Sequence, residues 1–160
     1  MTKMLEFLTP LYYLFSESRR LFYQKGLLGR TRVPALIVSV GNITTGGTGK
    51  TTVTQYLANY FREDGKQVVV VGHGVSGSRK GLVISDRNGI LTGVRRAGDE
   101  AYLLARNLPG IPVLSGRRRE ILAQIACKKF GAEVVILDDA FHALRLYRDI
   151  DILVFNKFSR

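Results

Sequence analysis

Short apolar runs alternate with longer segments of mixed polarity along most of this chain. After residue 33, each apolar run is bounded by glycine, proline or charged residues. Uninterrupted apolar runs of this length are typical of strands that are buried on both faces of a sheet. We expect strands at residues 35–40, 68–71, 111–114, 134–137 and 152–155, and a small hairpin over residues 83–91 around Asn88-Gly89.

The segments between these runs repeat their apolar residues at helical spacing. We expect helices at residues 50–62, 99–107 and 117–130. One face of the first helix should hold Val53, Tyr56, Leu57 and Tyr60, and the inward face of the third should hold Ile121, Leu122, Ile125 and Ala126. Strands that alternate with helices need crossover connections, so the pattern predicts an α/β fold with a mostly parallel sheet.

The first 32 residues follow a different pattern. Residues 5–15 are apolar and aromatic, basic residues follow them, and Thr9 can cap a helix that has Pro10 in its first turn. An amphipathic helix in a membrane interface has this composition, but so does a helix packed on a domain, and the residues alone leave both open. We expect two parts, an amphipathic basic helix at residues 1–32 and a core domain at residues 33–160.

Composition adds charge to this picture. The 160 residues are one domain's worth and include 24 Lys and Arg against 13 Asp and Glu, for a formal net charge of +11. This balance favours an anionic partner, whether a nucleotide, a nucleic acid or an acidic membrane surface. The single cysteine, Cys127, excludes an internal disulfide framework and is expected to be a small residue of the protein core, on a helix. No apolar run is long enough to predict a membrane-spanning helix.

A glycine-rich loop separates the first expected strand from the first expected helix. Residues 44–51 read Thr-Thr-Gly-Gly-Thr-Gly-Lys-Thr. Glycines let consecutive backbone N–H groups point at phosphate oxygens, Lys50 places a cation against the β and γ phosphates, and the Thr51 hydroxyl suits Mg²⁺. Thr44 stands where the strict motif has glycine, but the strand–loop–helix context agrees with it. The expected nucleotide-binding residues are Thr45, Gly46, Gly47, Thr48, Gly49, Lys50, Thr51 and Thr52.

Two pairs of adjacent acidic residues are candidates for metal binding or catalysis. Asp138 and Asp139 end an apolar strand, which is the Walker B pattern that delivers a carboxylate beside magnesium. Asp99 and Glu100 open a helix, where the helix dipole favours acids. A base or metal-side carboxylate near the γ-phosphate explains the second pair equally well.

Two basic runs remain, Arg95-Arg96 and residues 117–119. A solvated face and a contact with an anionic substrate are both consistent with them. His73 and His142 lie too far from any Cys/His cluster to suggest zinc.

Taken together, these motifs resemble those of the tetraacyldisaccharide 4′-kinase (lipid A 4′-kinase) family. The similar segments, in order, are the aromatic and basic N-terminal segment before Val33-Pro34, residues 40–51, Gly98-Asp99-Glu100, Asp138-Asp139-Ala140-Phe141 with Leu144, Arg148-Asp149 and Asp151-Ile152. The resemblance implies a P-loop NTPase-like three-layer sandwich. It also implies transfer of phosphate from ATP to the 4′-hydroxyl of a tetraacylated glucosamine disaccharide 1-phosphate in lipid A biosynthesis.

The resemblance also implies roles for individual residues. Lys50 corresponds to the phosphate-binding lysine and Asp99 to the family's catalytic base. The residues around Mg²⁺ would be Thr51, Glu100, Asp138 and Asp139. The implied partners are ATP, the acylated disaccharide lipid and a membrane surface at the cytoplasmic face of the inner membrane, with no nucleic acid.

The chain departs from the family's pattern in three respects. Residues 72–76 read Gly-His-Gly-Val-Ser where the family has Ser-Arg-Gly-Tyr-Gly. Ala143 stands at a family histidine, with His142 one position earlier. We expect these residues to lack the family's second, smaller domain. A nucleotide-binding but catalytically impaired homologue therefore stays open, as does a P-loop kinase for another anionic substrate.

Overall fold

The computed structural model describes residues 18, 21–23, 25, 27–42, 49–73 and 81–155. Most of the helix expected within residues 1–32, including its apolar stretch at residues 5–15, and residues 44–48 of the glycine-rich loop lie outside these described residues. Among the first 32 residues, positions 18 and 21–23 are helical, and the Tyr23 side chain is buried. No helix in the described ranges is both long and apolar enough to cross a bilayer.

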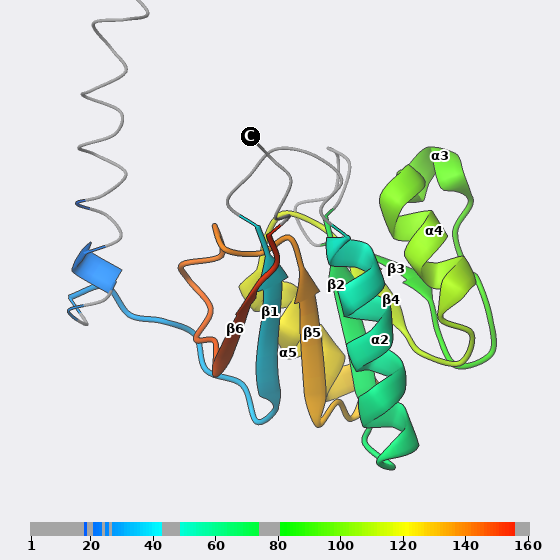
Figure 1. The fold of residues 1–160 in the computed structure, drawn as a ribbon, viewed down its shortest axis with the longest axis horizontal. Helices are drawn as coiled ribbons and strands as arrows, with labels where there is room; N and C mark the ends of the chain where they lie inside the picture. The colour runs from blue at the N-terminus through cyan, green and yellow to red at the C-terminus, as the bar shows by residue number, and fades with distance from the viewer. Residues whose placement is uncertain are drawn as a thin grey trace, which may run out of the picture.

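A six-stranded sheet lies at the centre of the described structure (Figure 1). Its order is β3-β4-β2-β5-β1-β6, and every neighbouring pair is parallel except β3 with β4. The strands are β1 (Leu36–Gly41), β2 (Val68–Gly72), β3 (Leu82–Ser85), β4 (Val113–Ser115), β5 (Val134–Asp138) and β6 (Ile150–Leu153). The prediction of a mostly parallel α/β sheet is confirmed.

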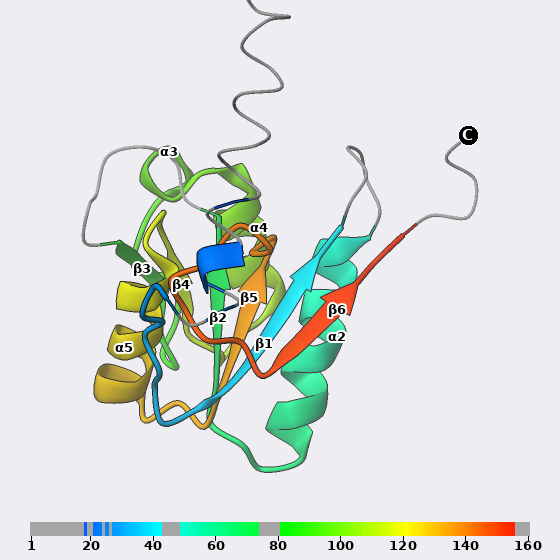
Figure 2. The same cartoon turned by 90° about the vertical axis from the view of Figure 1, so that its left-hand side faces the viewer.

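Helices cover both faces of this sheet (Figure 2). The helices are α2 (Lys50–Glu63), α3 (Val94–Ala97), α4 (Asp99–Asn107) and α5 (Arg119–Phe130). Helices α2 and α4 pack into one apolar core, which includes Ala58, Leu104 and Val70. Helix α5 packs into the other core with Leu122, against side chains such as Val71 that point from the opposite face of the sheet. The result is a three-layer sandwich, and the short α3 is the helix that the sequence pattern did not predict.

The inward face of α2 differs from the predicted one. Tyr56 and Tyr60 are 68% and 56% exposed, and their rings stack on the solvent side with centroids 6.4 Å apart. Thr54 and Ala58 are buried against the sheet instead, and Val53 and Leu57 flank them. The helix is therefore turned so that its small residues meet the strands, and the apolar face that the sequence pattern predicted is only partly the buried one. In α5, Leu122 and Ala126 are buried, while Ile121 and Ile125 are half-buried.

The expected hairpin is present but its second arm is short. The Asp86 carboxylate accepts hydrogen bonds from the backbone N–H groups of Asn88 and Gly89 at the turn. Beyond the turn, Ile90 forms an isolated antiparallel bridge with Ser85 rather than a strand. The last strand, β6, begins two residues before the predicted 152, because its pairing with β1 and not its side-chain pattern sets its start.

The parallel strands bring their carboxyl ends to one edge of the sheet. Gly41, Gly72 and Asp138 end β1, β2 and β5 at this edge, and the same edge receives the first residues of α2 and α4 (Figure 1). Ligands of open α/β sheets bind outside the carboxyl ends of the strands. The chemistry-bearing residues of the sequence are therefore expected to meet here.

Candidate nucleotide-binding site

Lys50 lies between the ends of two strands of the sheet. It opens α2 directly after Gly49, whose φ of 81° lies in the left-handed region that favours glycine. Its Nζ donates a hydrogen bond to Asn42 Oδ1 at 2.9 Å and lies 3.9 Å from Asp139 Oδ1. The ammonium group is thus held at the carboxyl edge between the residue that follows β1 and the residue that follows β5.

Asp138 is buried at the end of β5. Its Oδ1 accepts a hydrogen bond from the Thr54 hydroxyl of α2 at 2.9 Å. Burial raises the pKa of the Asp138 carboxyl, and the neighbouring charges of Asp139 and Glu100 raise it further. The Thr54 hydrogen bond and the charge of Arg119 lower this pKa. The carboxylates of Asp139 and Glu100 thus lie near Asp138, and a cation beside them would offset their mutual repulsion.

Arg119 is a buried cation, 5% exposed, at the first position of α5. One guanidinium nitrogen donates to the carbonyl oxygens of Gly72 and, at 2.8 Å, Gly116; the other donates to the carbonyl oxygen of Asp138 at 3.1 Å. Burial lowers the pKa of Arg119, and the charges of Asp138 and Asp139 oppose that shift. Arginine stays protonated in such surroundings because its unperturbed pKa is so high. The guanidinium therefore joins the ends of β2, β4 and β5.

The burial of Arg119 distinguishes it from the other arginines of the two basic runs. Arg95, Arg96, Arg117 and Arg118 are exposed, in agreement with a solvated face. Arg119 belongs to no solvated face, because its donors are engaged with backbone carbonyls inside the fold.

The acidic pair Asp99 and Glu100 opens α4 at the same edge (Figure 1). Gly98 precedes them with a φ of 83°, which turns the chain sharply from α3 into α4. Both side chains are exposed, and Glu100 lies near enough for its charge to act on the pKa of Asp138. The structure therefore brings the second acidic pair towards the first.

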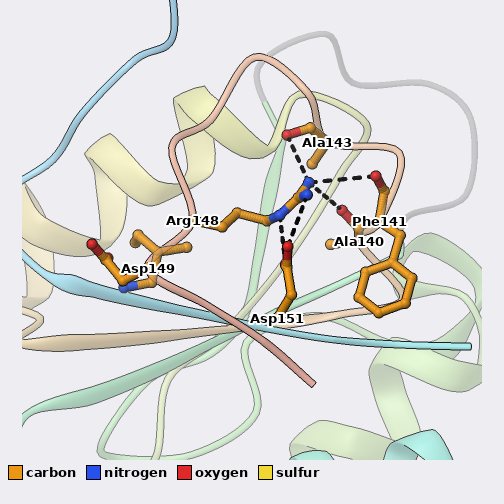
Figure 3. A network of polar contacts seen from close by, with 7 residues as sticks. Ala140, Phe141, Ala143, Arg148, Asp149 and Asp151 are labelled. Carbon is orange, nitrogen blue, oxygen red and sulfur yellow. Dashed lines mark hydrogen bonds and ion pairs between the residues drawn. The ribbon is translucent and has the colours of Figure 1, made fainter. Parts of the chain in front are cut away.

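The segment after β5 folds back over the end of β1. Asp139 takes a left-handed φ of 51°, and the Phe141 ring then lies directly against Gly41. Arg148 faces three carbonyl groups of this segment and pairs with Asp151 (Figure 3). His142 is exposed on the same segment.

Sequence reasoning missed Thr54 altogether, and it gave Asn42, Arg119 and Arg148 no individual role, since they appeared only within longer segments. Thr54 had one available signal, since it is a polar residue on the inward side of an amphipathic helix. The partners of Arg119 are backbone carbonyls, and Arg148 faces three more besides its pair with Asp151; such carbonyls carry no sequence signature. Of the predicted nucleotide-binding residues, Gly49, Lys50, Thr51 and Thr52 fall in the described ranges and lie at the start of α2.

The donor chemistry fits Mg²⁺ bound together with a nucleotide. Within the described ranges, no group of three or more His, Cys, Asp or Glu side chains could hold a metal alone. Magnesium ordinarily binds one or two carboxylates together with substrate phosphates and waters, and it needs no all-protein cage. Asp138, Asp139 and the Thr51 hydroxyl are hard oxygen donors of the required kind.

These features define a P-loop nucleotide-binding fold: a strand leads through a glycine turn to a lysine at the start of the next helix, and the neighbouring strand ends in an aspartate. The profile of one family, described as Tetraacyldisaccharide-1-P 4′-kinase, matches residues 1–160. The chain therefore belongs to that family, and the resemblance noted in its motifs is confirmed.

Relatives and a solved structure agree with this assignment. The Tetraacyldisaccharide 4′-kinase of Halothermothrix orenii is 42% identical over 153 residues, covering 94% of this chain and 40% of the relative. That of Desulfotalea psychrophila is 41% identical over 151 residues, covering 93% and 43%. The crystal structure of LpxK from Aquifex aeolicus in complex with ATP superposes with a TM-score of 0.82 at 35% identity, covering 95% of this chain and 49% of that one. The chain thus spans about half the length of these relatives, or less.

Proposed function

We propose that this chain binds ATP together with Mg²⁺ and serves a kinase that phosphorylates the 4′-hydroxyl of the tetraacyldisaccharide 1-phosphate precursor of lipid A. The observation that carries the proposal is the position of Lys50, 2.9 Å from Asn42 Oδ1 and 3.9 Å from Asp139 Oδ1, at the start of α2. A helix N-terminus and a lysine at one sheet edge form a site for phosphate groups. The solved relative is in complex with ATP, which supports the same assignment.

The proposed roles combine those implied by the family with the positions of the described side chains at this edge. Lys50 and the backbone of residues 45–52 bind the phosphates, and Lys50 stabilises the charge of the transferring phosphoryl group. Thr51, Glu100, Asp138 and Asp139 would hold Mg²⁺, which would supply positive charge against the phosphates. Asp99, exposed at the start of α4, acts as the base that takes the proton of the 4′-hydroxyl. The core domain at residues 33–160 carries all of these groups.

The N-terminal part, residues 1–32, is proposed to place this site at the cytoplasmic face of the inner membrane. Its aromatic and basic composition suits a membrane interface, where the acylated substrate lies. Deletion of residues 1–25 should release the protein from vesicles that contain anionic lipid. Undiminished sedimentation of the deletion variant with those vesicles would refute this part of the proposal.

Nucleotide binding is tested with a fluorescent ATP analogue and Mg²⁺. Removal of a charged phosphate contact is worth about 1.5–3 kcal/mol, so Lys50→Ala should weaken binding by at least tenfold. Lys66→Ala is the matched control, because Lys66 pairs with Glu133 at 3.5 Å and lies beyond the opposite end of α2. Equal affinity of wild type and Lys50→Ala would refute the phosphate-binding role of Lys50.

Turnover is tested separately with ATP, Mg²⁺ and the detergent-solubilised disaccharide lipid, and with detection of a new 4′-phosphate. ATP binding without product would favour the second candidate, a nucleotide-binding but catalytically impaired homologue. The departures from the family's pattern at Ala143 and residues 72–73 are the observation that supports this second candidate.

A further inference from the structure

The side chain of Arg148 faces three carbonyl groups of the segment that follows β5. One of its terminal nitrogens lies 3.4 Å from each of the carbonyl oxygens of Ala140, Phe141 and Ala143 (Figure 3). Three carbonyl dipoles that converge on one point repel one another unless a cation lies between them. The guanidinium supplies that charge, so the shape of this segment depends on Arg148.

The same guanidinium is anchored to the sheet through Asp151. Arg148 Nε donates to Asp151 Oδ1 at 2.7 Å and its second terminal nitrogen donates to Asp151 Oδ2 at 3.1 Å, a two-point pair (Figure 3). Asp151 belongs to β6 and lies opposite Ser39 of β1. Two-point arginine–carboxylate pairs fix direction as well as distance. Arg148 therefore holds the segment after β5 in register with β1.

The neighbouring Asp149 strengthens this connection to β1. Its carboxylate accepts a hydrogen bond from the Ile37 N–H at 2.8 Å, and its own N–H donates to the Ile37 carbonyl at 3.0 Å. The backbone on the carboxyl side of Arg148 is thus fixed to the central sheet. Movement of the guanidinium relative to β1 is correspondingly restricted.

The segment that Arg148 holds carries a carboxylate of the proposed site. Asp139 precedes Ala140 directly and has a left-handed φ of 51°, a conformation that its surroundings must maintain. Its carboxylate is half-exposed and its partner Lys50 lies at 3.9 Å, which is a loose contact. Among the residues that the structure describes, neither burial nor a short hydrogen bond holds the Asp139 side chain, so the conformation of the backbone after it contributes to its position.

We propose that Arg148, paired with Asp151, is a positioning residue that sets the place of Asp139 for a divalent cation bound with the nucleotide. Arg148 reaches no phosphate or metal in this role; it acts through the carbonyls of residues 140, 141 and 143. The inference rests on the proposed function, since it requires that the site bind Mg²⁺ and nucleotide together. A purely structural role for Arg148 predicts lower stability but the same response to Mg²⁺.

The experiment separates these roles with a Mg²⁺ titration of the full chain at a fixed concentration of a fluorescent ATP analogue. Loss of groups that orient metal ligands typically costs about 10- to 100-fold in metal affinity. Arg148→Ala should therefore raise the Mg²⁺ concentration at half-saturation by about tenfold, with unchanged affinity for the nucleotide in EDTA. Arg148→Lys should lie in between, because an ammonium restores the charge but not the two-point pair. Thermal unfolding of each variant is recorded alongside.

Arg145→Ala is the matched control. Arg145 lies in the same segment, its side chain is 58% exposed, and its acidic neighbour Glu120 is 3.9 Å away. Its Mg²⁺ titration should coincide with that of the wild type. If Arg148→Ala does not fold, the Asp151→Asn variant, altered at an exposed position, tests the same role. Its Mg²⁺ midpoint should rise a few-fold because the Arg148–Asp151 pair loses its negative charge.

The outcomes distinguish the two proposals. Wild-type protein that binds no nucleotide, with or without Mg²⁺, refutes the proposed function and the positioning role together. Wild-type protein that binds the Mg²⁺-nucleotide, beside an Arg148→Ala or Asp151→Asn variant with the same Mg²⁺ midpoint, refutes the positioning role alone.

Discussion

The contact between Gly41 and Phe141 predicts that a single added methyl group will be costly at the end of β1. A Cβ placed on Gly41 would lie 2.8, 2.8 and 2.9 Å from three ring atoms of Phe141. These separations fall short of ordinary van der Waals contact by about half an ångström. The φ of Gly41 lies outside the positive region, so alanine is allowed there by the backbone, and the cost arises from the ring alone.

The magnitude follows from overpacking and from the loss of the ring. Extra methyl groups in a packed interior cost about 1–3 kcal/mol, so Gly41→Ala should destabilise the protein by about 2 kcal/mol. Phe141→Ala removes a half-buried ring and should cost about 2 kcal/mol, below the full-burial range. Once the ring is gone, Gly41→Ala should be neutral or stabilising by up to about 1 kcal/mol, because glycine is unfavourable within a strand. The two changes should therefore be strongly non-additive.

Urea unfolding of wild type, both single variants and the double variant measures this coupling. The expected interaction free energy is at least about 1 kcal/mol, with the double variant more stable than the sum of the single changes predicts. An equal cost of Gly41→Ala in the presence and absence of the Phe141 ring would refute the assignment of the clash to that ring.

Three further predictions concern two buried polar groups and Cys127, which is half-buried rather than in the core as the sequence predicted. Arg119→Leu leaves three strand-end carbonyls without their donor and should lower the free energy of unfolding by about 3–5 kcal/mol in urea titrations; a loss below about 1 kcal/mol would show that the carbonyls find other partners. Thr54→Val removes the hydroxyl that donates to Asp138 and should cost about 1–3 kcal/mol, whereas Thr52→Val, at an exposed position, should cost much less; equal costs would contradict the role of the hydrogen bond. Burial raises the pKa of the Cys127 thiol, so its alkylation by iodoacetamide should be slow at neutral pH and should speed up on unfolding. The pH at which the alkylation rate reaches half of its maximum should lie above that of a free cysteine. A half-maximal pH equal to that of free cysteine, or lower, would contradict this.

The sheet could be predicted from the sequence because its central strands are buried on both faces. Strands β2 and β5 are buried at every position, so the sequence of each strand is almost uninterrupted by polar residues. Lys50 and the two acidic pairs were recognisable for a similar reason, since phosphate and metal chemistry restricts the residue types. The short helix α3 has no such constraint, because its four residues contribute only Ala97 to the core.

Other features could not be predicted because their partners are not side chains with a recognisable spacing. Tyr56 and Tyr60 fit a helical apolar stripe, yet the sheet accepts the smaller Thr54 and Ala58 beside it. Arg119 stands in a basic run that suggests solvent or substrate, and only the folded backbone places three carbonyls around it. Recognition of such an arginine requires knowledge of which strands end together, which local pattern does not provide.

The two buried or half-buried arginines also explain how this edge of the sheet can accept an anion. The carboxyl ends of parallel strands and the segment after β5 present carbonyl oxygens to the same region, and these partial negative charges oppose a phosphate. Arg119 binds the carbonyls that end β2, β4 and β5, and Arg148 binds those of residues 140, 141 and 143. With these carbonyls paired, the positive N-terminus of α2 and the ammonium of Lys50 would attract the phosphates of the proposed nucleotide with less opposition. The positive charges at this edge therefore have two roles. The guanidinium groups of Arg119 and Arg148 bind backbone carbonyls, and this pairing lets the charge of Lys50 favour the phosphate groups of the proposed nucleotide.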